Sequence, residues 1–165
     1  MEKKAIITLA LLLFGISQVF GQYNSERHTL FQQTLLMSSL EKHFEQHPLY
    51  EEITSADFQG PTQEAFYVLN NEYTKASARL YKFQIPVEYI DRNAINAKGI
   101  DHYFVFTGIK YPSPASAEIS YEYYKRGESG KMKKISGKAE FALMGTEWVV
   151  DPELTREQVE VIAIR

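Results

Sequence analysis

The chain has 165 residues, of which 44% are hydrophobic and 13% aromatic, and its formal net charge is only -3. This combination provides enough apolar surface for a core, so it excludes wholesale disorder and low-complexity scaffolds. The sequence has no cysteine, which excludes a disulfide framework, a thiolate zinc or iron-sulfur site and a cysteine nucleophile.

The N-terminus has the layout of a secretory signal peptide. Lys3 and Lys4 precede an apolar run that reaches Phe20, and Gly21 offers the small residue that a signal peptidase requires. We expect residues 1–21 to be removed. The alternative is an uncleaved membrane anchor, but the run is shorter and more interrupted than the roughly 20 apolar residues of a spanning helix. After cleavage we therefore expect no membrane span.

Export is the expected localisation, and residues 22–165 are expected to form one α+β domain. Removal of the leader leaves 16 basic and 20 acidic residues, a net charge of -4. An exported chain without cysteine resembles a bacterial periplasmic or secreted protein more than a eukaryotic extracellular module. The acidic balance and the location argue against nucleic acid as a partner, although six basic residues gather around residues 125–138. We interpret that cluster as a solvated edge, with an anionic glycan or membrane surface as the alternative.

The first half of the mature chain has helical periodicity. Apolar residues recur on one face of residues 25–46, which predicts an amphipathic helix that Pro48 ends. Residues 49–59 are expected to be a connector. A second helix is predicted from Thr62 to about Asn71, because apolar residues recur at helical spacing after Gly60-Pro61.

The second half alternates instead. Residues 115–123 and 135–143 place apolar side chains at every second position, which predicts two strands joined by a hairpin loop at 126–130. Charge selects a register in which Glu122 faces Lys134 and Glu118 faces Lys138, with Tyr121 opposite Ile135. A register two residues longer would set Glu118 against Glu140, and like charges directly opposite are destabilising.

The remaining segments are predicted from shorter patterns. Both faces of the 102–110 strand are apolar, so we expect it to be central. Pro86 lacks a backbone donor, so we expect an edge or bulge there. Asp151-Pro152 is expected to end the strand that begins near Glu147. The complete set is an extended segment at 81–89, a helical turn at 91–96, and strands at 102–110, 147–150 and 159–164.

This order resembles a known fold class. Two helices precede an antiparallel sheet in which Ala117-x-Ile119-x-Tyr121 returns as Gly137-x-Ala139-x-Phe141 and closes at Glu147-Trp148-Val149-Val150. The pattern resembles the cystatin-like class, particularly nuclear transport factor 2-like folds. The resemblance implies N-terminal helices packed on one curved antiparallel sheet, with a conical cavity between them. It raises the expectation of small-molecule binding but transfers no catalytic residue.

Three segments resemble catalytic motifs, but none of them has the complete residue pattern that its motif requires. His43 and His47 are four apart, but Glu45 does not directly follow the first histidine as the zinc-protease motif requires, so we expect a solvated helix end and no metal site. Residues 127–131 match neither a nucleophile elbow nor a phosphate loop. Ser39 and Lys42 have the Ser-x-x-Lys spacing without the companion motifs.

The aromatic excess, with 11 Tyr and 10 Phe, suggests a pocket. Tyrosines have an apolar body and a polar tip, which suits pocket walls. We predict a ligand-binding wall formed by His102, Tyr103, Tyr121 and Tyr123. The competing interpretation is that these side chains only fill the core and cross-strand pairs.

Together these observations predict an exported, non-catalytic binding or interaction domain. Its expected partner is a small apolar molecule or another exported protein, with no catalytic residue, cofactor or metal assigned. The alternative is a small cofactor-free hydrolase or isomerase that uses a cavity carboxylate or His102 as general base. A third class, an assembly subunit that pairs through its sheet, would expose a broad apolar face.

Overall fold

The computed structural model describes residues 25–74, 79–127 and 130–162. The predicted leader, the cleavage point before Gln22, the tip of the hairpin loop and the last residues of the tail lie outside these ranges. Within them the chain forms four helices: residues 25–35, α2 Ser38–Phe44, α3 Pro48–Thr54 and α4 Arg92–Lys98. The helices pack on a mostly antiparallel sheet, so the chain has an α+β fold.

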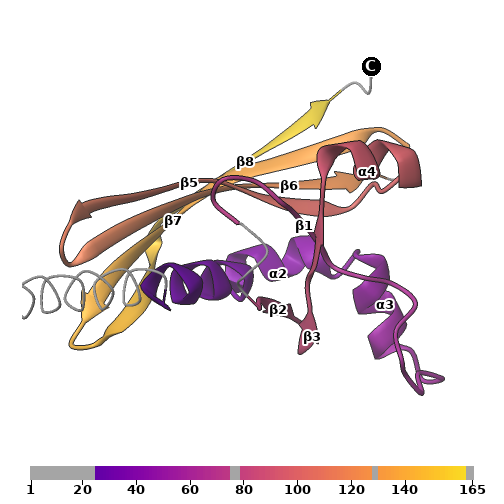
Figure 1. The fold of residues 1–165 in the computed structure, drawn as a ribbon, viewed down its shortest axis with the longest axis horizontal. Helices are drawn as coiled ribbons and strands as arrows, with labels where there is room; N and C mark the ends of the chain where they lie inside the picture. The colour runs from indigo at the N-terminus through magenta and orange to yellow at the C-terminus, as the bar shows by residue number, and fades with distance from the viewer. Residues whose placement is uncertain (1–24, 75–78, 128–129, 163–165) are drawn as a thin grey trace, which may run out of the picture.

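The main sheet has six strands in the order β4-β1-β5-β6-β7-β8 (Figure 1). Their bounds are β1 Tyr67–Leu69, β4 Glu88–Ile90, β5 Tyr103–Ser113, β6 Ser116–Arg126, β7 Met132–Met144 and β8 Glu147–Ile162. Strands β5 to β8 form an antiparallel meander, whereas β1 runs parallel to both β4 and β5. A separate hairpin pairs β2 Tyr81–Lys82 with β3 Ile85–Pro86.

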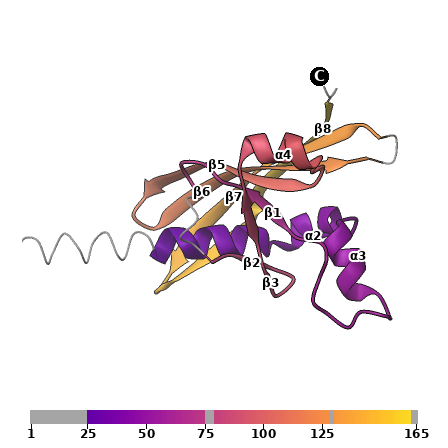
Figure 2. The same ribbon diagram turned by 45° about the vertical axis from the view of Figure 1, so that its right-hand side comes forward.

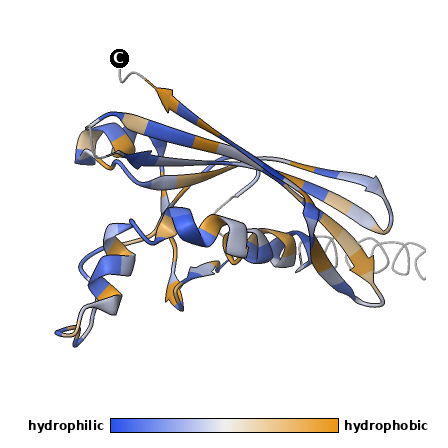
Figure 3. Cartoon of the chain, turned by 180° about the vertical axis from the view of Figure 1, so that it is seen from behind, coloured by the Kyte–Doolittle hydropathy of each residue, from blue (hydrophilic) through white to orange (hydrophobic). Residues whose placement is uncertain are grey.

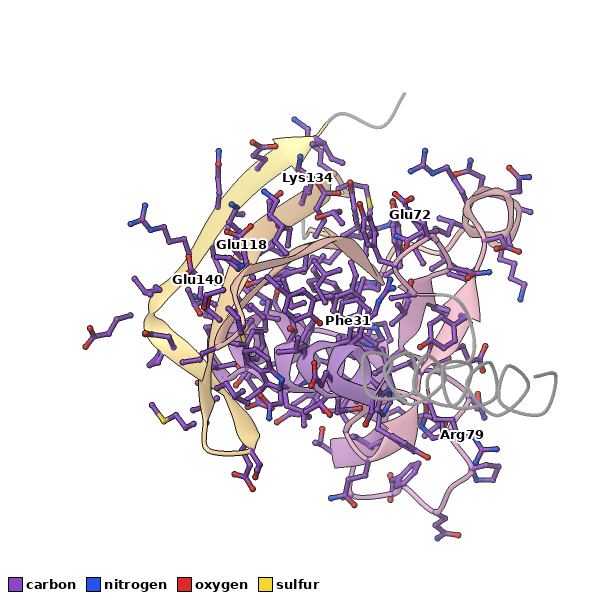
Figure 4. The ribbon with its side chains drawn as sticks, turned by 60° about the vertical axis from the view of Figure 1, so that its left-hand side comes forward. Phe31, Glu72, Arg79, Glu118, Lys134 and Glu140 are labelled. Atoms are coloured by element: carbon purple, nitrogen blue, oxygen red, sulfur yellow. The ribbon has the colours of Figure 1, made fainter. Side chains whose placement is uncertain are left out.

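The helix formed by residues 25–35 and α2 cover one face of the sheet, and α4 covers part of the other (Figure 2). The alternation predicted for the hairpin strands is confirmed, because Ile119 and Phe141 are buried in the main core together with Leu40 of α2. Hydrophilic and hydrophobic residues alternate visibly along the long strands (Figure 3). Phe31 lies among the side chains between helix and sheet (Figure 4).

Strand β5 is central and covered on both sides, as predicted. Phe104 and Phe106 belong to the main core, while Val105 packs with Ile95 of α4 in a second cluster. The pairing register shifts between Phe106 and Gly108. This bulge reverses the facing of the strand, because Ile109 packs on the main core rather than beside Val105 as the alternation predicted.

The predicted register of the β6–β7 hairpin is wrong. The strands pair Glu118 with Glu140 and Tyr121 with Gly137, two residues away from the charge-based choice. The like charges are tolerated because Lys138 reaches Glu118 diagonally at 3.0 Å. Core packing also fixes the register: the Tyr121 ring lies so close over Gly137 that a Cβ there would be 2.4 Å from the ring. Side-chain shape therefore outweighs surface charge here.

Two predictions for residues 49–71 are also wrong. The expected connector contains α3, because Pro48 occupies the first turn of a new helix and the His47 ring accepts a hydrogen bond from the Leu49 amide at 3.1 Å. The expected second helix is instead β1. Its short apolar run is buried on both faces, with Val68 in the main core and Leu69 in the second cluster, which is typical of a parallel strand.

The end of the sheet differs from the prediction as well. Asp151-Pro152 does not end the strand, since β8 continues to Ile162. Instead the register shifts so that residues 152–155 stand opposite Ala139 alone. Pro152 is accommodated in this bulge, where its missing donor breaks no ladder bond. Residues 159–162 are extended as predicted, as part of the same strand.

Candidate functional site

The space between helix and sheet, where the resemblance implied a cavity, is filled by aromatic rings. Phe44 of α2 packs at 4.9 Å from the ring of Tyr123 and at 5.2 Å from that of Phe66. Tyr121 is 1% exposed and Tyr123 is fully buried. Burial raises the pKa of the Tyr123 hydroxyl well above its ordinary value. These two predicted site residues are therefore core residues in this structure.

The structure does not bring the four predicted site residues to one wall. Tyr103 stacks on Tyr124 at 4.7 Å in the second cluster, on the opposite side of the sheet. His102 lies beside the ring of His47, 5.3 Å between centroids, and its Nδ1 is 2.7 Å from an oxygen of Asp101. The binding role of this set remains a prediction.

The side chain of Asp101 contacts both His102 and Arg126. Its other oxygen accepts a hydrogen bond from Arg126 at 2.6 Å. Burial alone would raise the pKa of Asp101, but the hydrogen bonds from Arg126 and His102 outweigh it and lower that pKa. The arrangement is a satisfied ion-pair network, which accounts for His102 without a ligand.

An open groove lies elsewhere, between the end of the first helix and β8. Its volume is about 700 Å³, which falls in the range of small-molecule sites. We call it the Trp148 groove. Its lining combines apolar side chains with hydroxyl, amide and charged groups: Gln33, Leu36, Met37, Ser38, Ser39, Lys42, Glu147, Trp148, Val149, Val150, Pro152, Thr155 and Glu157.

A break in the helix opens one wall of the groove. Residues 25–35 end in a helical turn, and Met37 is extended before α2 begins. The break turns Leu36 outward, where it is 55% exposed. The buried ammonium of Lys82 donates to the freed Leu35 carbonyl at 2.9 Å. A cation at a helix C-terminus is stabilising, so Lys82 holds the chain in the geometry that forms this wall.

The bulge in β8 forms the other wall. Trp148 and Val150 precede it, and Pro152 and Thr155 belong to it. Thr155 donates its hydroxyl hydrogen bond to the Asp151 carbonyl at 2.9 Å, which closes the bulge on itself. A bulge bends its strand and redirects side chains, so the same irregularity that escaped prediction shapes the groove.

Glu157 is the polar centre at the groove floor. It accepts a hydrogen bond from the Tyr121 hydroxyl at 3.1 Å, and its other oxygen is 3.3 Å from His43 Nε2 and 3.5 Å from Lys42 Nζ. The side chains of Glu157 and His43 are each 13% exposed. Burial lowers the pKa of His43, although Glu157 opposes the shift. The carboxylate is thus held in place by three side chains, two from α2 and one from β6.

Sequence patterns do not identify Glu157, Trp148 and Leu36 as site residues. Trp148 is expected only near the end of a strand, and Glu157 has no assigned role. The expectation of a solvated helix end at His43 and His47 is wrong, because His43 is mostly buried against Glu157 and His47 is 1% exposed. Their different contacts also separate them: His47 stacks on Phe66 at 5.0 Å.

Two further features of the described residues concern metals and membranes. Within residues 25–74, 79–127 and 130–162, no group of three histidine or acidic side chains is arranged to hold a metal ion. In the same ranges no helix combines the length and apolar character needed to cross a membrane. Comparison with protein-family models, with curated proteins and with solved structures gives no significant match.

Proposed function

We propose that this chain is an exported, non-catalytic binding domain whose ligand occupies the Trp148 groove. The observation that carries the proposal is the groove itself: an open volume of about 700 Å³ whose lining combines apolar side chains with polar and charged groups. Such a lining suits a small amphipathic molecule, with its apolar part against Trp148 and Leu36 and its polar part toward Ser38. The site therefore differs from the tyrosine-lined cavity predicted from the sequence.

The proposal includes export and a finer fold assignment. The leader at residues 1–21 supports a periplasmic or secreted location. The helices laid across one face of a long-stranded sheet (Figure 1) support a cystatin-like or nuclear transport factor 2-like fold. The aromatic filling between Phe44 and Tyr123 departs from the conical cavity of that class, which is why we place the ligand outside it.

A specific observation supports the enzymatic alternative. His43 and Glu157 form a pair next to the groove, and a carboxylate beside a histidine is a common acid-base arrangement. However, Glu157 is already engaged by Tyr121, His43 and Lys42. This engagement favours a structural anchor for the groove floor over a free general base.

The test is native mass spectrometry of the chain purified from its natural compartment, starting at Gln22. We expect a co-purified small molecule, and we expect Leu36→Glu to remove it because the carboxylate would stand in the apolar wall. Leu154→Glu is the matched control, since Leu154 is similarly exposed but does not line the groove. Retention of the ligand by Leu36→Glu would contradict the proposed site.

Hydrolytic or isomerase activity that disappears in His43→Gln, while the co-purified molecule stays bound, would favour the enzymatic alternative. The same variant is expected to retain the ligand if the chain only binds it. Catalytic activity therefore separates the two classes, and retained ligand shows that the His43→Gln variant still has its binding site.

A further inference from the structure

The outer edge of the sheet carries an apolar strand segment away from the groove. Residues 156–162 form the C-terminal arm of β8, which pairs with residues 132–138 of β7 without a register shift. β8 is the last strand of the sheet, and its arm lies at the margin of the molecule (Figure 1 and Figure 2). Val159 is 56% exposed and Val161 is 62% exposed.

Edge strands usually carry features that block pairing with another chain, such as proline, a bulge or an inward-pointing charge. The first half of β8 has such features at Pro152 and in the bulge that follows it. The C-terminal arm has no proline and no bulge, its one inward-pointing charge is Glu157, and its two valines share a face with Ile135, the partner of Val159. Within the part of the chain that the structure describes, no strand pairs with the outer side of this arm, so exposed backbone groups lie beside two exposed valines.

We propose that the C-terminal arm of β8 pairs with the same arm of a second copy of this chain, antiparallel and around a two-fold axis. A two-fold interface is formed by the same surface on both copies, so the arm must be complementary to itself. It is: Arg156 and Glu160 lie on one face of the strand, two positions to either side of Gln158.

Charge limits the possible registers. Antiparallel pairing centred on Gln158 sets Arg156 of each copy directly opposite Glu160 of the other. Pairing centred on Val159 places Arg156 diagonally across from Glu160 of the other copy. It also sets Val159 directly opposite Val159 of the other copy. Centring the pair on Glu157 or Glu160 would bring that carboxylate opposite its own copy, which is destabilising. Of the registers centred on residues 157–160, two therefore remain, and both join Arg156 to Glu160.

The paired arms would extend each six-stranded sheet into the other. The exposed backbone groups of each arm gain hydrogen-bond partners. In the register centred on Val159, the Val159 side chains of the two copies also become cross-strand neighbours. The Trp148 groove stays open, because only Glu157 of the arm belongs to it. Dimer formation is thus independent of ligand binding.

Sedimentation of the mature chain tests the proposal. We expect a concentration-dependent dimer, and we expect Val159→Glu to yield a monomer, because the new carboxylate would face Glu157 of the other copy in one register and its own copy in the other. The unfolding midpoint should be unchanged when both proteins are compared at a concentration where they are monomeric. Leu154→Glu is the matched control, with similar exposure outside the arm, and it should remain dimeric. A wild-type chain that stays monomeric at every concentration, or a dimer that survives Val159→Glu, would overturn the proposal.

Charge exchange makes the test sharper. Arg156→Glu alone places like charges together twice in the dimer and should weaken the association by about tenfold. Adding Glu160→Arg restores opposite charges and should restore the affinity. If the double variant is as weak as the single one, the arms do not meet in this way.

Cross-linking reports the contact directly, because the chain has no native cysteine. Residues opposite their own copy have Cα atoms close enough for a disulfide. Oxidation should therefore produce a covalent dimer of Gln158→Cys or of Val159→Cys, whichever lies at the axis. Met144→Cys, which is exposed elsewhere, should stay monomeric. Equal cross-linking of all three would contradict a specific interface.

Discussion

The two sides of the first helical segment differ in how completely side chains fill the space beside them. Toward β5 and β6, the space between helix and sheet is closed by stacked rings such as Phe31 on Phe106, 4.3 Å apart. Toward β8, the same stretch of chain leaves an open groove beside Trp148. The difference follows from regularity. Where helix and strands keep their period, side chains interdigitate and fill the space. Where the helix breaks and β8 bulges, the walls separate.

Phe44→Ala should have the largest effect, because Phe44 lies at the centre of the closed side. Its ring contacts those of Phe66, Phe104 and Tyr123, and truncation of a buried phenylalanine costs about 3–5 kcal/mol. We expect this loss in the free energy of unfolding measured by urea titration. Leu36→Ala, on the open side, should change it by less than about 0.5 kcal/mol. Similar losses of unfolding free energy in Phe44→Ala and Leu36→Ala would contradict the difference in packing between the closed and the open side.

Lys82→Met probes the link between the two sides. The substitution leaves the Leu35 carbonyl without its buried donor and should lower the free energy of unfolding by roughly 1–3 kcal/mol. It should also weaken ligand binding, because the helix break that exposes Leu36 is no longer held. A variant that unfolds more readily yet binds the ligand normally would show that Lys82 does not shape the groove.

The free energy of unfolding should decrease as the pH falls, because His47 is buried on the closed side. Burial lowers the pKa of His47 to about 3 from its ordinary value of 6.5. Below pH 6.5 the unfolded chain therefore binds a proton at His47, whereas the folded chain does not. The stability present above pH 6.5 is progressively lost as the pH falls toward 3. The expected slope approaches about 1.4 kcal/mol per pH unit.

Urea titrations at a series of pH values measure the slope at His47. His47→Asn is the control, because asparagine can still cap α3 but does not titrate. The unfolding free energy of this variant should depend less on pH, by an amount that corresponds to nearly one proton fewer taken up on unfolding. Equal slopes in both proteins would mean that His47 is not buried in its neutral form.

Tyr121→Phe should have the smallest effect, since it removes one hydroxyl and keeps the ring. The lost hydrogen bond to Glu157 should cost about 0.5–1.5 kcal/mol of folding free energy. Because the Tyr121 hydroxyl joins the closed core to the groove floor, ligand affinity should also change. Unfolding by denaturant and ligand titration of the same preparation would measure both. An unchanged affinity would show that Glu157 is held well enough by His43 and Lys42.

Local patterns predicted the regular parts of this fold. The alternation around Ile119 and Phe141 correctly identified the buried faces of β6 and β7. The apolar character on both sides of Phe104 correctly identified a central strand. The short helical segment after Asp91 is present as α4. In each case the signal and the structure it predicts lie within a few residues of each other.

The irregular parts depend on contacts distant in sequence. The break after Leu35 depends on Lys82, which arrives from β2, so the periodicity of residues 25–46 could not reveal it. The β6–β7 register depends on the fit of Tyr121 over Gly137. The site follows the same rule, because Glu157 meets His43 only after the sheet has formed. Pro152 was the one visible signal: it predicts a strand end, and the structure has a bulge there instead.

The central claim is that the ligand occupies the Trp148 groove and not the aromatic interior. Trp148 is the only tryptophan in the sequence, so its indole N–H gives a single, assignable nuclear magnetic resonance signal. On titration with octyl glucoside below its micelle concentration, we expect a saturable shift of this signal while the ring signals of Phe44 and Tyr123 stay in place. A titration that moves the Phe44 and Tyr123 signals and leaves the indole unchanged would contradict it.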